Sequence, residues 1–204
     1  MLLLSLAGLA TGLSLIVAIG AQNVFVLQQG LQRRHVALVV VVCALSDVVL
    51  ILLGIGGLSL VIRRAPVAVE VARWAGAAFL ISYGVLAARR AALGNDAIRL
   101  EREATRGAGT VLATCLAFTW LNPHVYLDTV LLLGSIANTH GPTGRWWFGA
   151  GASLGSVVWF TALGLGARLL TPLFRRPAAW RVLDTGVALV MFTVAALLLL
   201  APGA

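Results

Sequence analysis

The sequence is poor in charged side chains and contains no lysine. Charged residues make up 11% of its 204 positions and hydrophobic residues 60%, and the mean hydropathy is +0.99. Soluble domains contain about 25% charged and about 45–50% apolar residues, so this chain lacks the polar surface that a water-soluble fold of its size needs. The composition therefore excludes soluble nucleotide-binding, sandwich and α+β domains, and it indicates an integral membrane protein.

Acidic residues are also scarce, since seven Asp and Glu stand against 15 arginines, for a net charge of +8. Many of the arginines lie in pairs between apolar segments, such as Arg33-Arg34 and Arg89-Arg90, rather than along one face of a helix. This placement is typical of helix-end anchors that set membrane topology. We therefore expect the lipid bilayer as a partner, and no nucleic acid.

Cysteine occurs only twice, at Cys43 and Cys115, and each lies within an apolar segment. Thiols in that setting are mostly small packing residues. No CxxC spacing or Cys/His cluster is present, so the sequence predicts no metal site and no cofactor.

Six apolar segments are long enough to cross a membrane, which takes about 20 helical residues. Each is apolar on all sides instead of alternating, which favours an all-α bundle over a β-barrel. A charged linker at about 94–109 separates three predicted helices from three, within one transmembrane domain covering residues 1–204. We place the six segments at about 2–27, 36–62, 67–89, 110–136, 146–170 and 179–200.

The two halves of the chain, about 1–93 and 110–204, resemble each other. Residues 46–56 align without a gap with residues 156–166, and both stretches are followed by paired arginines and a proline. Chance similarity between two helices rich in small residues is the alternative. Because three helices per half reverse the orientation of the second half, the pattern predicts two inverted three-helix repeats, which are typical of secondary transporters.

Arginines are unequally divided between the two sides of the predicted bundle. One side carries only Arg63, Arg64, Arg73 and Arg145, and the other side carries the remaining arginines. The positive-inside rule puts the richer side in the cytoplasm, and therefore both termini outside.

Helix-breaking residues interrupt the first and the fourth predicted helices. Gly20, Gln22 and Asn23 lie inside the first, and Asn122 and Pro123 lie inside the fourth. Proline lacks a backbone donor and disfavours helix at the residue before it. Interrupted helices at matching positions of two halves point to a transporter's binding site, where half-helix N-termini attract a substrate carboxylate. A simple kink closed by an amide side chain is the alternative for either break alone.

Asp47 and Asp128 are predicted to lie deep in the bilayer, in the second and fourth helices. A charged group there costs about 2.5–3.5 kcal/mol on insertion scales, which predicts a role in binding substrate or a proton. An interhelical salt bridge and a permanently neutral carboxyl group are the alternatives. Glu70 and Asp184 also fall inside predicted helices, but close enough to their starts to reach the interface.

Two further sets of residues have a structural and a functional interpretation. Trp120 and Tyr126 flank the second break and are candidates to face a cation, with packing as the alternative. Glycines recur at close spacing, which serves either close helix packing or a homodimer interface; examples are Gly8, Gly12, Gly151 and Gly155.

Several segments resemble the LysE-type family of lysine and arginine exporters. The longest run is Thr-Trp-Leu-Asn-Pro-His-Val-Tyr-Leu-Asp at 119–128, joined by Gly-Ala-Gln-Asn-Val-Phe-Val-Leu at 20–27 and by Ser46-Asp47. The resemblance implies export of L-lysine, L-arginine or their analogues across the bacterial inner membrane, two inverted three-helix halves, and functional roles for Asp47 and Asp128. Ala21 departs from relatives, which usually have proline at that place.

The sequence as a whole predicts a secondary transporter that exports basic L-amino acids in exchange for protons. Two aspartates and two half-helix N-termini complement a substrate with two positive groups and one carboxylate. Exporting a cation against an inside-negative potential costs about 2.3 kcal/mol per charge per 100 mV, and exchange for a proton cancels that cost. The alternatives are an exporter of neutral amino acids or homoserine and a membrane assembly protein without transport. An enzyme is not expected, because neither aspartate has the Gly-x-Gly-Asp arrangement of an intramembrane aspartyl protease.

Overall fold

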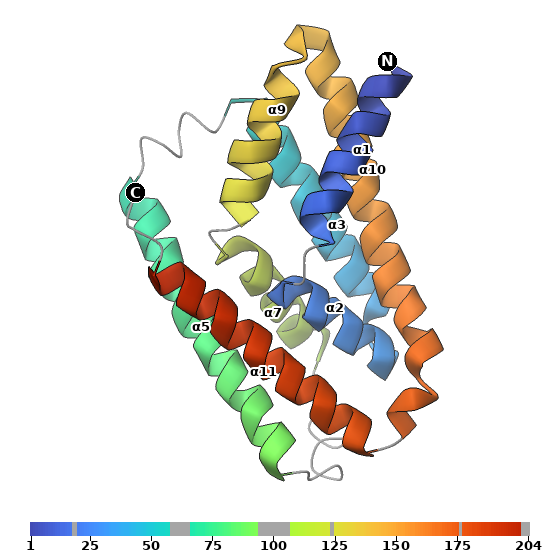
Figure 1. Cartoon of the computed structure of the whole chain (residues 1–204), viewed down its shortest axis with the longest axis vertical. Helices are drawn as coiled ribbons and strands as arrows, with labels where there is room; N and C mark the ends of the chain where they lie inside the picture. The colour runs from blue at the N-terminus through green and yellow to red at the C-terminus, as the bar shows by residue number, and fades with distance from the viewer. Residues whose placement is uncertain (18–19, 58–65, 94–106, 123–124, 176, 201–204) are drawn as a thin grey trace.

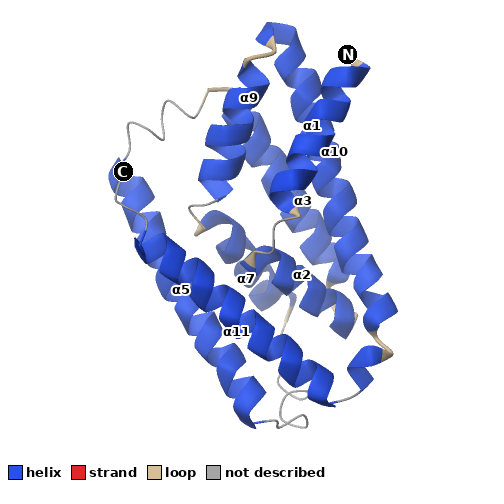
Figure 2. Ribbon diagram, viewed as in Figure 1, coloured by secondary structure: helices blue, strands red, loops and turns tan. Residues whose placement is uncertain are grey.

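The computed structural model describes residues 1–17, 20–57, 66–93, 107–122, 125–175 and 177–200, and helices dominate all of these ranges (Figures 1 and 2). No strand occurs in the part of the chain that is described. Pro123 and most of the predicted linker lie outside it. The helices are α1 (Leu2–Ile16), α2 (Ala21–Gln32), α3 (Val36–Ile55), α5 (Pro66–Leu93), α7 (Ala108–Trp120), η1 (Tyr126–Leu133), α9 (Gly134–Asn138), α10 (Gly141–Gly166), η2 (Ala167–Leu170), η3 (Leu173–Arg175) and α11 (Pro177–Leu200).

Four helical stretches are long and apolar enough to cross a membrane: Val36–Ile55, Arg73–Leu93, Gly141–Leu170 and Ala178–Leu200. The pair α1 and α2 passes the same test as one broken span, bent by 85°. The helix α7 is apolar but shorter. The expectation of an all-α, multi-pass membrane protein is therefore confirmed at this level.

Regular helix is interrupted at both places where the sequence predicts a break. In the first, α1 ends at Ile16 and α2 begins at Ala21, with Gly20 in an extended conformation before it. In the second, α7 ends at Trp120 and the chain resumes at Tyr126 as η1, a π-helix. A π-helix is rare and frequently occurs at functional sites.

Many large apolar side chains lie on the surface of the described helices. On α3, the side chain of Leu45 is 59% exposed, whereas Asp47 is 6% exposed. In a helix of a soluble protein, the leucine would be buried and the aspartate exposed. Cys43 and Cys115 are fully buried, and their sulfur atoms lie 3.2 Å apart as free thiols.

Glycines bring the helix backbones into direct contact within the chain. A Cβ atom at Gly8 would overlap the backbone of Phe148, and one at Gly151 would overlap the backbone of Ser5, so these glycines join α1 to α10. A Cβ at Gly134 would lie 2.8 Å from the carbonyl oxygen of Gly54, which joins α9 to α3. These glycines therefore serve close helix packing within the chain.

The helices form two groups, with α2 and α7 between them (Figure 1). One group consists of α1, α3, α9 and α10. The other is the pair of α5 and α11, which pack along each other for much of their length. The short helices α2 and α7 contact both groups, and they extend from the two breaks toward the end of the bundle that carries Arg33 and Arg34.

We predict that Gly151→Ala destabilises the protein because its methyl group meets the Ser5 backbone, which cannot move aside as a side chain can. Overpacking of this kind costs about 1–3 kcal/mol. Thermal unfolding in detergent measures the effect as a lowered midpoint. The matched control is Gly186→Ala, since a Cβ at this helical glycine meets no atom within 4 Å. Equal midpoints for the two variants would contradict the packing described for α1 and α10.

Candidate functional site

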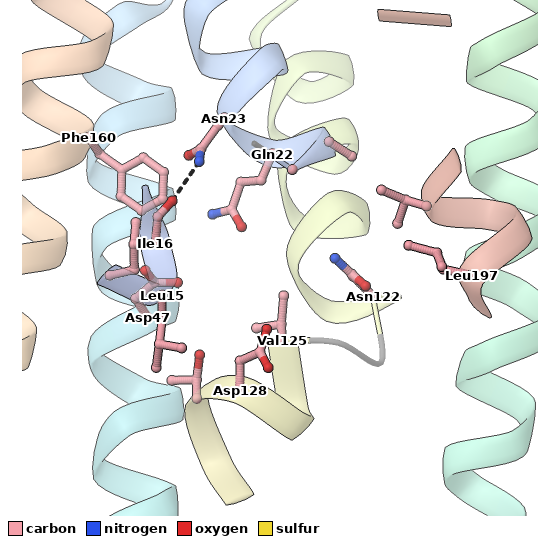
Figure 3. Close-up of a pocket in the computed structure, with 14 residues that line it drawn as sticks. Leu15, Ile16, Gln22, Asn23, Asp47, Asn122, Val125, Asp128, Phe160 and Leu197 are labelled. Carbon is pink, nitrogen blue, oxygen red and sulfur yellow. Dashed lines mark hydrogen bonds between the residues drawn. The ribbon is translucent and has the colours of Figure 1, made fainter. Parts of the chain in front are cut away.

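An open cavity of about 320 Å³ lies between the two helix breaks (Figure 3). From the first break it is lined by Gly20, Ala21, Gln22 and Asn23, and from the second by Asn122. The helices around the breaks complete the lining, with Asp47, Val125, Asp128, Thr129 and Phe160 among the residues involved. The structure thus brings the two predicted breaks and the two predicted aspartates to one place.

Asp47 lies on the cavity wall formed by α3. Its Oδ2 atom accepts a hydrogen bond of 2.7 Å from the Ser156 hydroxyl of α10. The partner is a neutral hydroxyl, so the structure does not place Asp47 in the interhelical salt bridge that was the alternative interpretation. A buried carboxylate with one hydroxyl partner keeps acceptor capacity for a cation or a proton.

Asp128 lies in the first turn of η1 and lines the same cavity. Figure 3 shows its side chain and that of Asp47 on neighbouring walls, both within the pocket. Asp128 is exposed where Asp47 is buried. The two carboxylates therefore differ in access, which allows one to meet an incoming cation before the other.

Asn23 closes the first break rather than pointing freely into the cavity. Its Nδ2 donates a 2.6 Å hydrogen bond to the carbonyl of Ile16, the last residue of α1. Its Oδ1 accepts a 3.1 Å hydrogen bond from Trp159 Nε1 of α10. One amide thus satisfies a backbone carbonyl freed by the break and ties the break to a spanning helix, which apolar surroundings require.

Tyr126 closes the second break in a comparable way. Its hydroxyl donates a 2.7 Å hydrogen bond to the carbonyl of Trp120, the last residue of α7. The Trp120 ring in turn donates through Nε1 to Ser46 of α3, at 3.3 Å. Neither aromatic residue lines the cavity. Both make the hydrogen bonds just described, whereas the sequence suggests that they face a bound cation.

Hydrogen-bond donors at the start of α2 also face the cavity. Gly20 caps this helix without a side-chain hydrogen bond, and the first amides of a helix have no partner within the helix. These amides form the positive end of the helix dipole. The side chain of Gln22 extends into the cavity (Figure 3), and its Nε2 has no hydrogen-bond partner among the described residues. The start of α2 and Gln22 thus lie on the cavity wall together with the two carboxylates.

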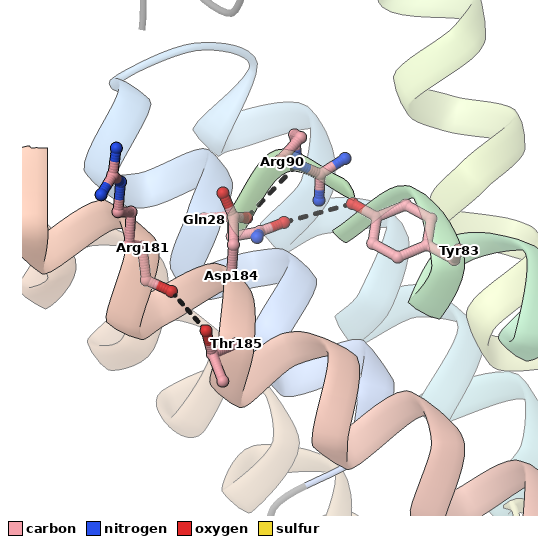
Figure 4. A network of polar contacts seen from close by, with 6 residues as sticks. All are labelled: Gln28, Tyr83, Arg90, Arg181, Asp184 and Thr185. Carbon is pink, nitrogen blue, oxygen red and sulfur yellow. Dashed lines mark hydrogen bonds and ion pairs between the residues drawn. The ribbon is translucent and has the colours of Figure 1, made fainter. Parts of the chain in front are cut away.

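A second set of buried polar residues lies away from the cavity, and the sequence pattern did not reveal it (Figure 4). Asp184 of α11 is 1% exposed and is thus packed inside the bundle. It pairs with Arg90 of α5, with 3.3 Å between Nε and Oδ1. Beside this ion pair, the Tyr83 hydroxyl donates a 3.1 Å hydrogen bond to Gln28 Oε1 of α2.

Known proteins resemble the chain over nearly all of its length. The model of the family described as LysE type translocator matches residues 13–201. A protein of Corynebacterium diphtheriae named lysine exporter LysE is 36% identical over 225 residues, covering 97% of this chain and 99% of that protein. Proteins of Mycobacterium bovis and Mycobacterium tuberculosis, each named as an amino-acid transporter, are 48% identical over 187 residues, covering 92% of both chains. No solved structure matches.

We predict that Asn23→Ala destabilises the first break, because the Ile16 carbonyl and the Trp159 N–H both lose their partner. A buried group left unsatisfied costs about 1–3 kcal/mol. The midpoint of thermal unfolding in detergent should fall accordingly. Asn138→Ala is the matched control: that amide also makes two hydrogen bonds, to Gly134 and Arg145, but at an exposed helix end where water replaces them. An equal change in both variants would contradict the bridging role of Asn23.

Proposed function

The chain belongs to the LysE type translocator family, and we propose that it exports basic L-amino acids, arginine and lysine, from the cytoplasm in exchange for protons. As a family member it is an amino-acid transporter of the membrane and not an enzyme. The observation that carries the proposal is the single cavity at which both helix breaks meet two aspartates.

The charges around the cavity complement a basic amino acid. Such a substrate has two cationic groups and one carboxylate. The uncapped start of α2, with Gln22, offers donors to the carboxylate. Asp47 and Asp128 offer acceptors to the two cationic groups, and Asn122 contributes a further polar side chain. A basic amino acid offers a cationic group to each of the two carboxylates, whereas a neutral one offers only its amino group, which is the physical ground for preferring a basic substrate.

Proton exchange follows from the electrical cost of moving a cation outward. Export of one positive charge against an inside-negative potential costs about 2.3 kcal/mol per 100 mV. One proton entering for each cation leaving cancels this work. A carboxylate that holds either the cationic group or a proton, but not both, would couple the two movements, and Asp47 is the buried candidate for this role.

By length and composition, the described helices supply four membrane passes, or five with α1–α2 as one broken pass. We propose the passes to be α1–α2, α3, α5, α7–η1–α9, α10 and α11, with three passes in each inverted half. The ends of α2, α5 and α10 then lie in the cytoplasm, where the arginine-rich side belongs by the positive-inside rule. Both termini lie outside the cytoplasm, and the membrane is the bacterial inner membrane.

We predict that purified protein in liposomes loaded with arginine releases it faster when the outside is acidified. Asp47→Asn keeps the size of the side chain but removes its charge. Loss of a charge-assisted contact of about 1.5–3 kcal/mol lowers arginine affinity roughly 10- to 100-fold, and efflux should no longer respond to the pH gradient. Glu70→Gln is the control, since that carboxylate is 45% exposed and paired with Arg73 on the surface of α5. Proton coupling is ruled out if neither the pH gradient nor Asp47→Asn changes the rate of efflux.

Substrate choice is tested by competition in the same liposomes. We expect unlabelled lysine and arginine to compete for efflux of labelled arginine, and citrulline and homoserine to compete weakly, because they lack the second cationic group. Homoserine competing as well as arginine would instead favour the alternative, an exporter of neutral amino acids of the wider superfamily.

A further inference from the structure

Four aromatic rings fill the space between the cavity and the arginine-rich end of the bundle. Phe25 follows the first break by one helical turn, and Phe118 precedes the second by one turn; their ring centroids lie 5.4 Å apart. Phe79 and Tyr83 of α5 pack edge-on against Phe118 at 4.9 and 5.0 Å. Phe25 and Phe118 are each 1% exposed. This aromatic plug joins α2, α7 and α5 through ring contacts.

A hydrogen bond fastens α5 to α2 beside the aromatic plug. The Tyr83 hydroxyl donates to Gln28 Oε1, and both residues are buried (Figure 4). The guanidinium of Arg90 lies 5.8 Å from the centroid of the Tyr83 ring and pairs with Asp184. Among the described residues, the contacts of α5 with α2 and α7 include this hydrogen bond and the ring contacts, beside apolar packing around Leu80.

The opposite end of the α5–α11 pair stands apart from the rest of the bundle. Val194 and Leu197 of α11 line the open cavity, and Figure 1 shows the C-terminal end of α11 diverging from α9. In the described chain, α5 and α11 pack more closely on α2 and α7 than on α1, η1 or α9. In the described chain the aromatic plug therefore packs on the α2 and α7 side of the cavity, and Val194 and Leu197 line the cavity nearer the C-terminal end of α11.

The α5–α11 pair is held together more firmly than it is held to its neighbours. The two helices pack along much of their length, and the ion pair of Arg90 with Asp184 joins them near one end. A Cβ atom at Gly84 would lie 3.0 Å from the ring of Phe192, so the backbone of α5 closely contacts α11 there. The other group is fixed by the glycine contacts of α1 with α10 and of α3 with α9.

We infer that the α5–α11 pair is the moving gate of the transporter, and that the aromatic plug with the Gln28–Tyr83 hydrogen bond closes its cytoplasmic side. The inference rests on the proposed transport and topology. In this inference the conformer described is the one open to the outside. Export requires a second conformer, in which α5 leaves Phe118 and Gln28 so that substrate reaches the cavity from the cytoplasm.

The internal repeat indicates where the pair goes in that second conformer. Exchange of the two proposed halves maps α5 onto α11, α2 onto η1–α9, and α7 onto α1. A pair that now packs on α2 and α7 would then pack on η1–α9 and α1 instead. This rotation closes the outer side of the cavity with the elements that are now separated from the pair.

Cross-linking tests the gate directly. Gln28→Cys and Tyr83→Cys are introduced together in a chain whose Cys43 and Cys115 are replaced by alanine, and are joined by a short reducible bifunctional thiol reagent. We expect arginine efflux to stop on cross-linking and to return on reduction. The matched control joins Gly84→Cys to Phe192→Cys, which lie within the moving pair, and should leave efflux unchanged.

The outcomes separate the gate from the transport function. Unchanged efflux after complete cross-linking of positions 28 and 83 overturns the gate and leaves arginine export standing. Loss of efflux in the control pair overturns the movement of α5 and α11 as one unit. Absence of arginine efflux in the unmodified protein overturns the proposed substrate or the transport function. The gate is then tested by a measurement that does not require transport.

That measurement is the accessibility of a cysteine at Val125, which lines the cavity, to a membrane-impermeant thiol reagent applied from the cytoplasmic side. Removing the hydrogen bond with Tyr83→Phe should raise the population of the second conformer, and so the labelling rate, about two- to tenfold. Ser82→Ala is the control, since that exposed hydroxyl bonds only within its own helix, to Ala78. A labelling rate that Tyr83→Phe leaves unchanged overturns the gate.

Discussion

A helix that stops within a membrane must satisfy its freed backbone groups without water, and this requirement governs the whole site. Asn23 satisfies the carbonyl of Ile16, and Tyr126 satisfies that of Trp120. Each bridging side chain comes from the element that follows the break, and each break is tied to a spanning helix by a tryptophan N–H. The described residues on either side of each break are therefore tied to one another, and the residues that begin α2 line the cavity.

The same molecule combines rigid and weakly joined contacts, and their distribution follows from side-chain size. Where a glycine lets two backbones touch, as Gly8 does with Phe148 and Gly151 with Ser5, the helices have little room to slide. Where aromatic rings meet, as at Phe118 and Tyr83, flat surfaces can separate and return. The cavity lies between the group of α1, α3, α9 and α10, which close backbone contacts hold together, and the α5–α11 pair. This position suits the gate proposed for that pair.

Local signals in the sequence predicted much of this structure, and contacts between distant segments were beyond them. Apolar segment length, glycine and proline placement, and an aspartate such as Asp47 in an apolar segment are all visible within one stretch of chain. The pairing of Arg90 with Asp184 is not, since it depends on α5 continuing to Leu93 and packing along α11. Likewise, the aromatic ring of Trp120 suggested a cation site. Its indole N–H instead donates to Ser46 of α3, a contact between segments distant in the sequence.

The ion pairs of α5 and α11 have a consequence for how the protein responds to voltage. Arg73 pairs with Glu70 on α5, and Arg90 pairs with Asp184 across the two helices. Paired charges cross an electric field as dipoles, so a shift of these two helices does little work against the membrane potential compared with an unpaired arginine of a voltage sensor. In the proposed movement the potential then acts on the transported ions and on Arg89 and Arg181, which lie outside these two ion pairs.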